Sequence, residues 1–322
     1  MIKDYIYLKT PKIASLITQI NTYRDLFEKI PKLPHIQENL LRKSTLKSSL
    51  YSARIEGNRL EMTDVEFGGI QNREKREVFQ IFDGLKFARS FKGRTTKEFI
   101  LELHQRVMDD LTAELGRFRT EPSAIFNTAG VAIYVAPSAQ KVPILVGKWL
   151  QFVNRRNSNL CDIAITHFVF EKIHPFLDGN GRVGRILMNW QLQKLGYGFA
   201  GLISFEDYLE QNRNNYYSTL AIEKKDITEF VEFILETVAQ SAQKVILQLQ
   251  KQEEGKIEDI LLPRRAEILA IIREHQVVTF DQIHRRFLSV NSRTLHYDLQ
   301  DLVRKGLIRK RGATRGSVYA PK

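Results

Sequence analysis

Residues 174–185 read His174-Pro-Phe-Leu-Asp-Gly-Asn-Gly-Arg-Val-Gly-Arg185. Gly179 and Gly181 come directly before a helical run, where glycines let backbone N–H groups turn inward and form an anion-binding nest. The N-terminus of the following helix, with its partial positive charge, points at the same place. Arg182 and Arg185 are three residues apart, so they are neighbours on the first helical turn and suit phosphate oxygens. The stretch therefore predicts a polyphosphate site at a loop-to-helix junction.

Two further side chains of this stretch indicate chemistry. Asp178 is an anion among anion-binding groups, and Mg²⁺ held by one carboxylate plus phosphate oxygens would remove the repulsion. His174, at the opposite lip of the loop, is the natural proton acceptor for an attacking hydroxyl. Phe176 is expected to anchor the loop in the core. Each residue alone is more typical of an ordinary turn or surface, and only their combination in this order favours a catalytic site.

The stretch matches every defining position of the motif H-x-F-x-D/E-G-N-G-R-x-x-R, so the chain resembles the Fic family of AMP transferases. We expect the resemblance to cover residues 34 to about 239. The family often has a second proline where Ala136 stands at the end of its flap. Residues 116–119 resemble the segment that leads into the flap, and residues 134–137 resemble its end. Tyr216 and Tyr217 resemble the paired tyrosines near the adenine.

The resemblance implies a reaction and a role for each residue. His174 would deprotonate a hydroxyl of a protein target or of this chain, Asp178 would hold Mg²⁺ on ATP, and Arg185 would take the γ-phosphate. The hydroxyl would attack the α-phosphorus in line and pyrophosphate would leave. The implied ATP contacts are Phe176, Gly179, Asn180, Gly181, Arg182, Arg185, Tyr216 and Tyr217. The implied flap, which would clamp the target backbone like an added strand, comprises Val131, Ala132, Ile133 and Tyr134.

Gly181 also bears on the type of reaction. The Doc branch of the family has Lys at this position and acts as a kinase, so glycine here favours AMP transfer. Other members of the family transfer different phosphate-containing groups, and the loop is compatible with those as well.

A second, shorter resemblance lies upstream at Ser52-Ala-Arg-Ile-Glu56-Gly57. It is similar to the family's inhibitory motif S/T-x-x-x-E-G/N, which implies that Ser52 and Glu56 restrain the enzyme, Glu56 by occupying Arg185. The alternative is an ordinary helix that ends at Gly57 with an exposed glutamate. In some relatives the same glutamate supports removal of AMP, and that reverse activity stays open.

Composition sets the class of protein. Hydrophobic residues make up 43% and charged residues 27% of 322, as in an ordinary globular protein. Cys161 is the single cysteine, so an internal disulfide is excluded and a reducing compartment is expected. The start lacks a signal-peptide core, and no apolar stretch approaches the roughly 18 residues of a membrane span. We therefore expect a cytoplasmic protein with no membrane partner.

The pattern of apolar residues predicts a mainly α fold: a Fic-type helical core with a small β-hairpin flap, followed by a C-terminal winged helix-turn-helix domain. The hairpin is expected between residues 119 and 143. Helices are expected over residues 34–54, 74–91, 97–111, 143–154, 159–172, 182–195, 204–222 and 227–252. The expected domains are an N-terminal helical region with the inhibitory helix (1–95), the catalytic core (96–250), a linker (251–262) and the winged helix (263–322).

The C-terminal segment carries most of the excess positive charge. Residues 263–322 hold +8 of the formal net charge of +12. Their pattern, with a capping box at residues 279–282 opening the second helix, resembles a winged-helix DNA-binding domain. The implied DNA contacts are Arg293, His296, Tyr297, Gln300, Arg309 and Arg311. Winged helices also serve as protein–protein modules, so that alternative stays open, as does a homodimer, which is common in relatives.

Two functions therefore compete. The first is an AMP-transferring enzyme restrained by Glu56. The second is a DNA-binding transcriptional regulator whose Fic core senses nucleotide, and a scaffold that is always inhibited is a third. A proton acceptor at His174 and a carboxylate at Asp178 favour the enzyme, because a sensor needs no base.

Overall fold

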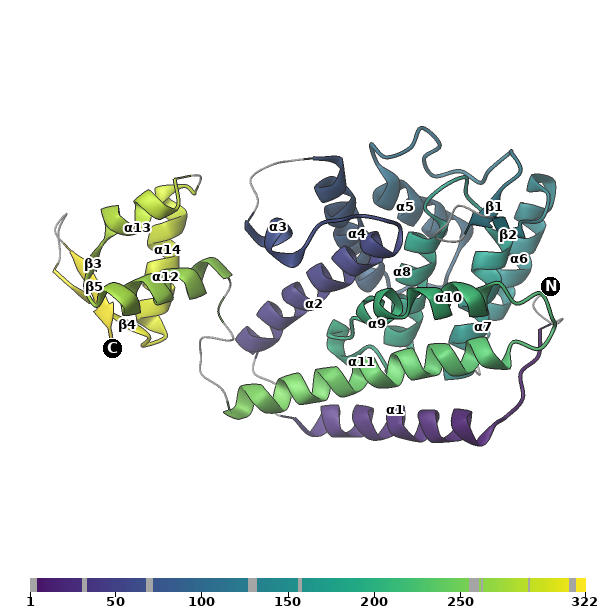
Figure 1. The fold of residues 1–322 in the computed structure, drawn as a ribbon, viewed down its shortest axis with the longest axis horizontal. Coiled ribbons are helices and arrows are strands. Elements are labelled where there is room, and N and C mark those ends of the chain that lie inside the picture. Colours follow the sequence, from purple (N-terminus) through teal and green to yellow (C-terminus); the bar gives the residue numbers. More distant parts are fainter. Residues whose placement is uncertain are drawn as a thin grey trace. The chain divides into compact units, whose positions relative to one another are not determined.

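The computed structural model describes residues 5–30, 34–67, 72–126, 132–155, 158–254, 261, 263–288, 290–312 and 317–322. The chain divides into two compact units (Figure 1). The first comprises Met1–Lys32 with Leu40–Leu249, and the second comprises Leu33–Asn39 with Gln250–Lys322.

The first unit is built almost entirely from helices, so the predicted mainly α fold is confirmed. Its helices are α1 (Pro11–Lys29), α2 (Pro34–Ile55), α3 (Met62–Phe67), α4 (Arg73–Ser90), α5 (Lys97–Met108), α6 (Val142–Val153), α7 (Leu160–Ile173), α8 (Asn180–Lys194), α9 (Glu206–Gln211), α10 (Arg213–Leu220) and α11 (Thr228–Glu254). Figure 1 shows α11 running beside α1, and Lys12 of α1 pairs with Glu236 of α11 at 2.9 Å.

The centre of this unit is the pair α7 and α8. Every residue of α7 is buried, including its charged Glu171 and Lys172. Asn159 begins it with a capping box to Asp162. The α8 helix packs against α7 and α4, and its residues Val183, Ile186 and Leu187 are fully buried. The loop between these two helices is thereby held in the middle of the unit.

Several elements differ from the sequence-based expectation. The single helix expected over residues 204–222 is two helices, because Asn212 (φ −112°, ψ 31°) interrupts the helical backbone between α9 and α10. The α5 helix ends before residue 111, because Asp110 adopts a positive φ of 54°. The α1 and α3 helices were not predicted.

The expected hairpin is present as two antiparallel strands, β1 (Ala124–Phe126) and β2 (Ala132–Val135), with Ile125 opposite Tyr134. Of the four residues predicted to form the flap, Val131 lies outside the described residues, as do the side chains of Ala132 and Ile133.

The second unit has its own core and a small sheet. Its elements are α12 (Pro263–His275), β3 (Val278–Thr279), α13 (Phe280–Arg286), α14 (Ser292–Arg304), β4 (Ile308–Arg311) and β5 (Val318–Pro321). The predicted capping box between Thr279 and Gln282 begins α13. The strand β3 was not predicted, and it pairs with β5 in an antiparallel sheet of order β3-β5-β4. The buried core of this unit includes Ile268, Ile272, Ile283, Leu295, Leu299 and Leu302.

Candidate functional site

The loop between α7 and α8 is fixed by contacts that leave it little freedom. His174 ends α7 in the left-handed region (φ 49°), and its carbonyl accepts a hydrogen bond of 2.7 Å from Nε of the buried Arg119. Gly179 caps α8 with φ 80°, and a Cβ there would lie 2.5 Å from the Met108 sulfur. Only glycine fits this position without strain or a shift of its neighbour.

The apolar anchor of the loop is Phe176, as predicted from the sequence. Its side chain is fully buried and stacks on the ring of His104, with centroids 3.8 Å apart. The Asn180 side chain brackets its backbone, accepting from the Phe176 N–H and donating to the Phe176 carbonyl, both at 2.8 Å. His104 also holds the backbone of the loop, because its Nε2 lies 3.1 Å from the Asp178 carbonyl oxygen. These contacts set the course of the chain from His174 to the start of α8.

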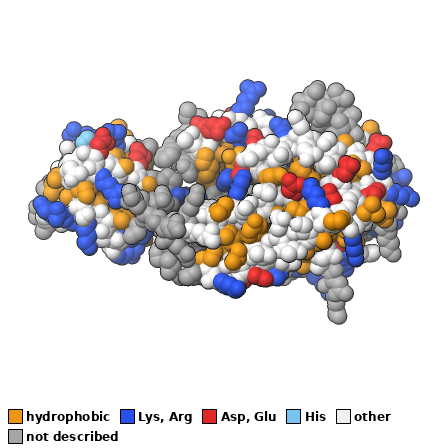
Figure 2. Space-filling view, turned by 60° about the horizontal axis from the view of Figure 1, so that its bottom comes forward, with side chains coloured by type: hydrophobic (Ala, Val, Ile, Leu, Met, Phe, Trp, Pro, Cys, Tyr) orange, Lys and Arg blue, Asp and Glu red, His pale blue; other side chains and the backbone are white. Residues whose placement is uncertain are grey.

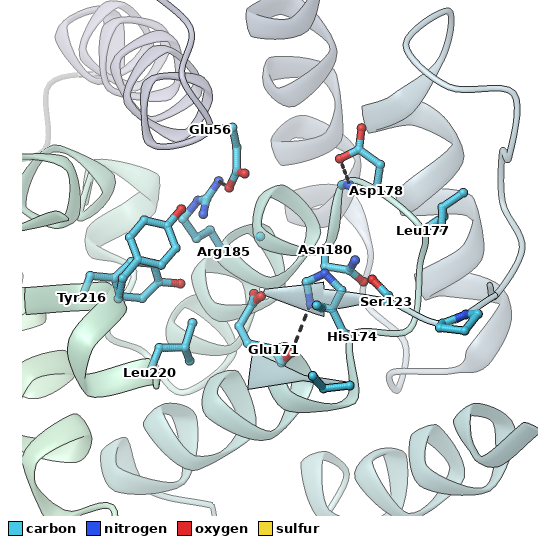
Figure 3. A pocket seen from close by; sticks show the side chains of 16 residues that line it. Glu56, Ser123, Glu171, His174, Leu177, Asp178, Asn180, Arg185, Tyr216 and Leu220 are labelled. Carbon is cyan, nitrogen blue, oxygen red and sulfur yellow. Dashed lines mark hydrogen bonds and ion pairs between the residues drawn. The ribbon is translucent and has the colours of Figure 1, made fainter. Parts of the chain in front are cut away.

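His174 has the protonation state that a general base needs. Its Nδ1 lies 3.2 Å from the carbonyl oxygen of Glu171 (Figure 3). A carbonyl can only accept, so Nδ1 carries the hydrogen and Nε2 keeps a free lone pair. Burial lowers the pKa of His174 to about 4, so the ring is neutral at physiological pH.

A pocket of about 620 Å³ opens beside this histidine. Figure 3 shows His174 on one side, with Glu56 and Arg185 facing each other on another. Its other polar walls include the backbone at the N-terminus of α8. Of the predicted site residues, those that line it are His174, Asp178, Gly179, Asn180, Gly181, Arg185, Glu56, Tyr216 and Tyr217. Phe176 is buried in the core instead.

Arg185 is buried and held by the upstream helix α2. Its Nη2 donates to Glu56 Oε1 at 2.8 Å and to the Ser52 carbonyl at 3.0 Å, and its Nε donates to Ser52 Oγ at 2.9 Å. Burial would raise the pKa of Glu56, but the charges of Arg185 and Arg182 together lower it, so the carboxylate is ionised. A Cβ at Gly181 would lie 2.4 Å from Glu56 Oε1, so glycine at this position makes room for the pair.

Arg182 is held by two carboxylates. Its Nη2 donates to Asp178 at 2.8 Å, and its Nη1 donates to Glu77 of α4 at 2.7 Å. The Asp178 side chain is 56% exposed and lines the pocket. No group of three or more His, Cys, Asp or Glu side chains that could hold a metal occurs among the described residues. The exposed Asp178 carboxylate is one group that could hold a cation, with oxygens of a bound molecule as the other ligands.

A family model described as Fic/DOC family matches residues 94–192, which include this loop, the flap and most of α8. The chain contains a Fic domain. A relative from Drosophila virilis, named protein adenylyltransferase Fic, is 27% identical over 252 residues, which are 70% of this chain and 50% of the relative. The protein of the same name from Drosophila yakuba is 30% identical over 201 residues, 57% and 38% of the two chains. The chain thus spans half or less of the length of these two relatives.

Solved structures show that the fold is shared. A Fic family protein from Desulfovibrio desulfuricans matches with a TM-score of 0.69 and 23% identity, over 99% of this chain and 98% of that one. A Fic-1 structure from C. elegans matches with a TM-score of 0.61 and 22% identity, over 74% and 73% of the two chains. At such identities the likeness concerns the fold alone.

The two tyrosines from α10 line the pocket of the Fic domain. Tyr216 is buried, and its hydroxyl lies 2.9 Å from Nε2 of His167. The Tyr217 hydroxyl lies 3.5 Å from the Ile55 carbonyl at the end of α2. Burial raises the pKa of both phenols, so both are neutral hydroxyls at physiological pH.

The hairpin of β1 and β2 contacts α7. The Lys172 ammonium of α7 is buried and lies 3.8 Å from the ring centroid of Tyr134 on β2, a cation–π contact. Val135, at the end of β2, is 74% exposed and lines the pocket.

Four residues that shape the Fic site were not predicted as individual site residues: Arg119, Glu77, His104 and Glu171. Glu171 is buried in the pocket wall, and burial raises its pKa to about 8. A carboxyl in the apolar run of α7 was the available signal, because such groups are seldom buried without a reason. Glu77 had no local signal, since it lies 105 residues before Arg182.

In the second unit, every residue predicted to contact DNA is exposed: Arg293, His296, Tyr297, Gln300, Arg309 and Arg311. His296 stacks on Phe280 of α13, with centroids 3.8 Å apart. The acidic Asp298 and Asp301 of α14 are buried and pair with Arg265 of α12. Figure 2 shows blue Lys and Arg side chains spread over the visible face of this unit.

Among the helices that the structure describes, none has both the length and the apolar character of a membrane-spanning segment.

Proposed function

We propose that the Fic domain transfers AMP from ATP to a hydroxyl group of a protein, either a separate target or this chain itself. The observation that carries the proposal is His174, whose unprotonated Nε2 stands beside a pocket that also contains a helix N-terminus and Arg185. The name protein adenylyltransferase carried by the Drosophila relatives supports the same reaction.

Each group around the pocket has its own role in the proposed reaction. The backbone N–H groups at the N-terminus of α8, together with Arg182 and Arg185, bind the phosphates, since such groups favour anions. Nε2 of His174 accepts the proton as the hydroxyl oxygen bonds to the α-phosphorus. The bond from the α-phosphorus to the bridging oxygen breaks, and pyrophosphate leaves. Tyr216 and Tyr217 supply flat walls for the adenine.

Asp178 would hold Mg²⁺ at the mouth of the site. When bound, that ion neutralises charge on the phosphate oxygens. Asp178 contributes a carboxylate at the pocket surface, and its Oδ1 contacts Arg182 Nη2 at 2.8 Å.

Glu56 would restrain this reaction. Its carboxylate occupies Arg185, the cation proposed for the γ-phosphate, so ATP cannot use that arginine until the pair separates. Ser52 supports the restraint by fixing the other edge of the same guanidinium.

The test is labelling with ATP that carries ³²P at the α-phosphate, using a cell lysate and the purified chain. The Glu56→Gly variant should label protein, and the further change His174→Ala should lower labelling by about 10²–10⁴-fold with ATP affinity unchanged. Label from the γ-phosphate in place of the α-phosphate would reject AMP transfer. Undiminished labelling by the His174→Ala variant would reject the base.

A second candidate function is DNA binding by the C-terminal unit, the resemblance being to a winged helix. The observation that favours it is an exposed set of basic and polar side chains on α14 and β4, in a segment with formal charge +8. In this proposal Arg293, His296, Tyr297 and Gln300 of α14 face base edges, and Arg309 and Arg311 lie along phosphates.

The test for DNA binding is an anisotropy titration of the full chain with duplex DNA at several salt concentrations. Affinity should fall with salt, with a log–log slope of about −0.9 for each phosphate neutralised. Arg309→Ala should weaken binding to all sequences alike, and Glu267→Ala on α12 is the control. Absence of binding at low salt would favour the protein-interaction alternative.

A further inference from the structure

One guanidinium in the site contacts two carboxylates of different exposure. Arg182, with 7% of its side chain exposed, contacts Glu77 at 2.7 Å and Asp178 at 2.8 Å. The Glu77 side chain is 15% exposed and the Asp178 side chain is 56% exposed. Asp178 is thus free to turn toward a ligand in the pocket, whereas Glu77 is enclosed.

Glu77 is held in place from its other side. Its Oε2 accepts a hydrogen bond of 2.9 Å from the Asn58 side chain, which also donates to the Glu74 carbonyl at 2.9 Å. Asn58 follows Gly57, whose φ of 103° ends the α2 helix, and its own N–H bonds to the Ala53 carbonyl at 3.1 Å. Glu77 therefore cannot leave Arg182 without breaking contacts at the end of α2.

This arrangement has a consequence for anions. With both carboxylates in contact, the charge of Arg182 is cancelled and Nη2 is occupied, so an approaching polyphosphate meets no net attraction from this side chain. When a divalent cation takes Asp178, Nη2 becomes available while Nη1 stays on Glu77. The same cation also removes the repulsion between Asp178 and the phosphates.

We propose that Glu77 makes nucleotide binding depend on a divalent cation, by cancelling the charge of Arg182 until the cation takes Asp178. Glu77 is a positioning residue in this scheme, since it touches neither nucleotide nor metal. The inference rests on the proposed function, because it takes Asp178 as the cation ligand and Arg182 as a phosphate ligand.

The experiment measures the dissociation constant of ATP by calorimetry, in EDTA and in saturating Mg²⁺. The parent is the full chain with Glu56→Gly and His174→Ala, so that Arg185 is free and no ATP is consumed. Glu77→Gln should tighten ATP binding in EDTA by a larger factor than in Mg²⁺. The ratio of the ATP dissociation constant in EDTA to that in Mg²⁺ should be about fivefold smaller than in the parent. That factor is the effect of one charge near the phosphates at a partly exposed site.

Two controls separate this effect from a general loss of structure. Asp83→Asn removes the same charge from the same helix, where Asp83 pairs with Arg106, and should leave the ratio unchanged. Glu77→Asp keeps the charge and should keep most of the ratio. If Glu77→Gln does not fold, Asn58→Ala loosens Glu77 without removing it and should lower the ratio by a smaller factor.

The outcomes are distinguishable. If Glu77→Gln weakens ATP binding by the same factor in EDTA and in Mg²⁺, Glu77 is merely structural and the inference is overturned. If the parent binds no ATP in either condition, the proposed function fails, and the inference fails with it.

Discussion

Replacing Glu56 by glycine removes the carboxylate that Arg185 contacts. The α2 helix ends at Ile55, so the new glycine lies one residue beyond the helix. A hydrogen bond between charged groups contributes about 1.5–3 kcal/mol. Because 30% of the Glu56 side chain is exposed, solvent screening places this pair near the lower end, at about 1.5 kcal/mol. ATP no longer has to displace that contact, so its dissociation constant should fall about tenfold.

The same substitution should lower the thermal stability of the fold. Without Glu56, the buried Arg185 keeps Ser52 as a partner but loses its counter-charge, so the melting temperature should fall, and ATP should restore it. Calorimetry gives the affinity, and label from the α-phosphate gives the activity. Glu61→Gly is the control, since Glu61 pairs with Arg54 at the surface. If the Glu56→Gly variant and the unsubstituted chain bind ATP with equal affinity and label equally at saturating ATP, the inhibitory role is refuted.

Burial lowers the pKa of His174 to about 4, so labelling by the Glu56→Gly variant should stay level from about pH 8 to about pH 5 and fall below that; a pH–rate midpoint near 6.5 would contradict the assignment. Burial raises the pKa of Glu171 to about 8 from an unfolded value of about 4.3, so its cost grows as pH rises between these values. Glu171→Gln should therefore raise the melting temperature more in alkaline than in acidic buffer, and an equal change in both would contradict this. Gly179→Ala should lower the free energy of unfolding in urea by about 1–3 kcal/mol more than Gly196→Ala, because the added methyl overpacks against Met108. Gly196 has a similar φ of 81° but nothing within 4 Å of an added methyl, so equal losses would show that the Met108 contact is unimportant.

The parts of the site that depend on neighbouring residues could be predicted from the sequence. The glycines at 179 and 181 and the arginines at 182 and 185 lie within seven residues, so their spacing alone places them at the start of one helix. The capping box at Thr279 followed in the same way, because a helix cap is settled within four residues.

Contacts between distant segments could not be predicted in this way. The sequence by itself determined that two glycines and two arginines lie at a loop-to-helix junction just after His174, because backbone geometry and side-chain spacing are local properties. Only the tertiary structure decided that Glu77 holds Arg182. It also decided that the Glu171 carbonyl accepts from Nδ1 of His174, which leaves Nε2 with a free lone pair, and that burial keeps this histidine neutral. The physical reason is that charge pairing and desolvation depend on which groups meet in space, and packing of whole helices brings these groups together.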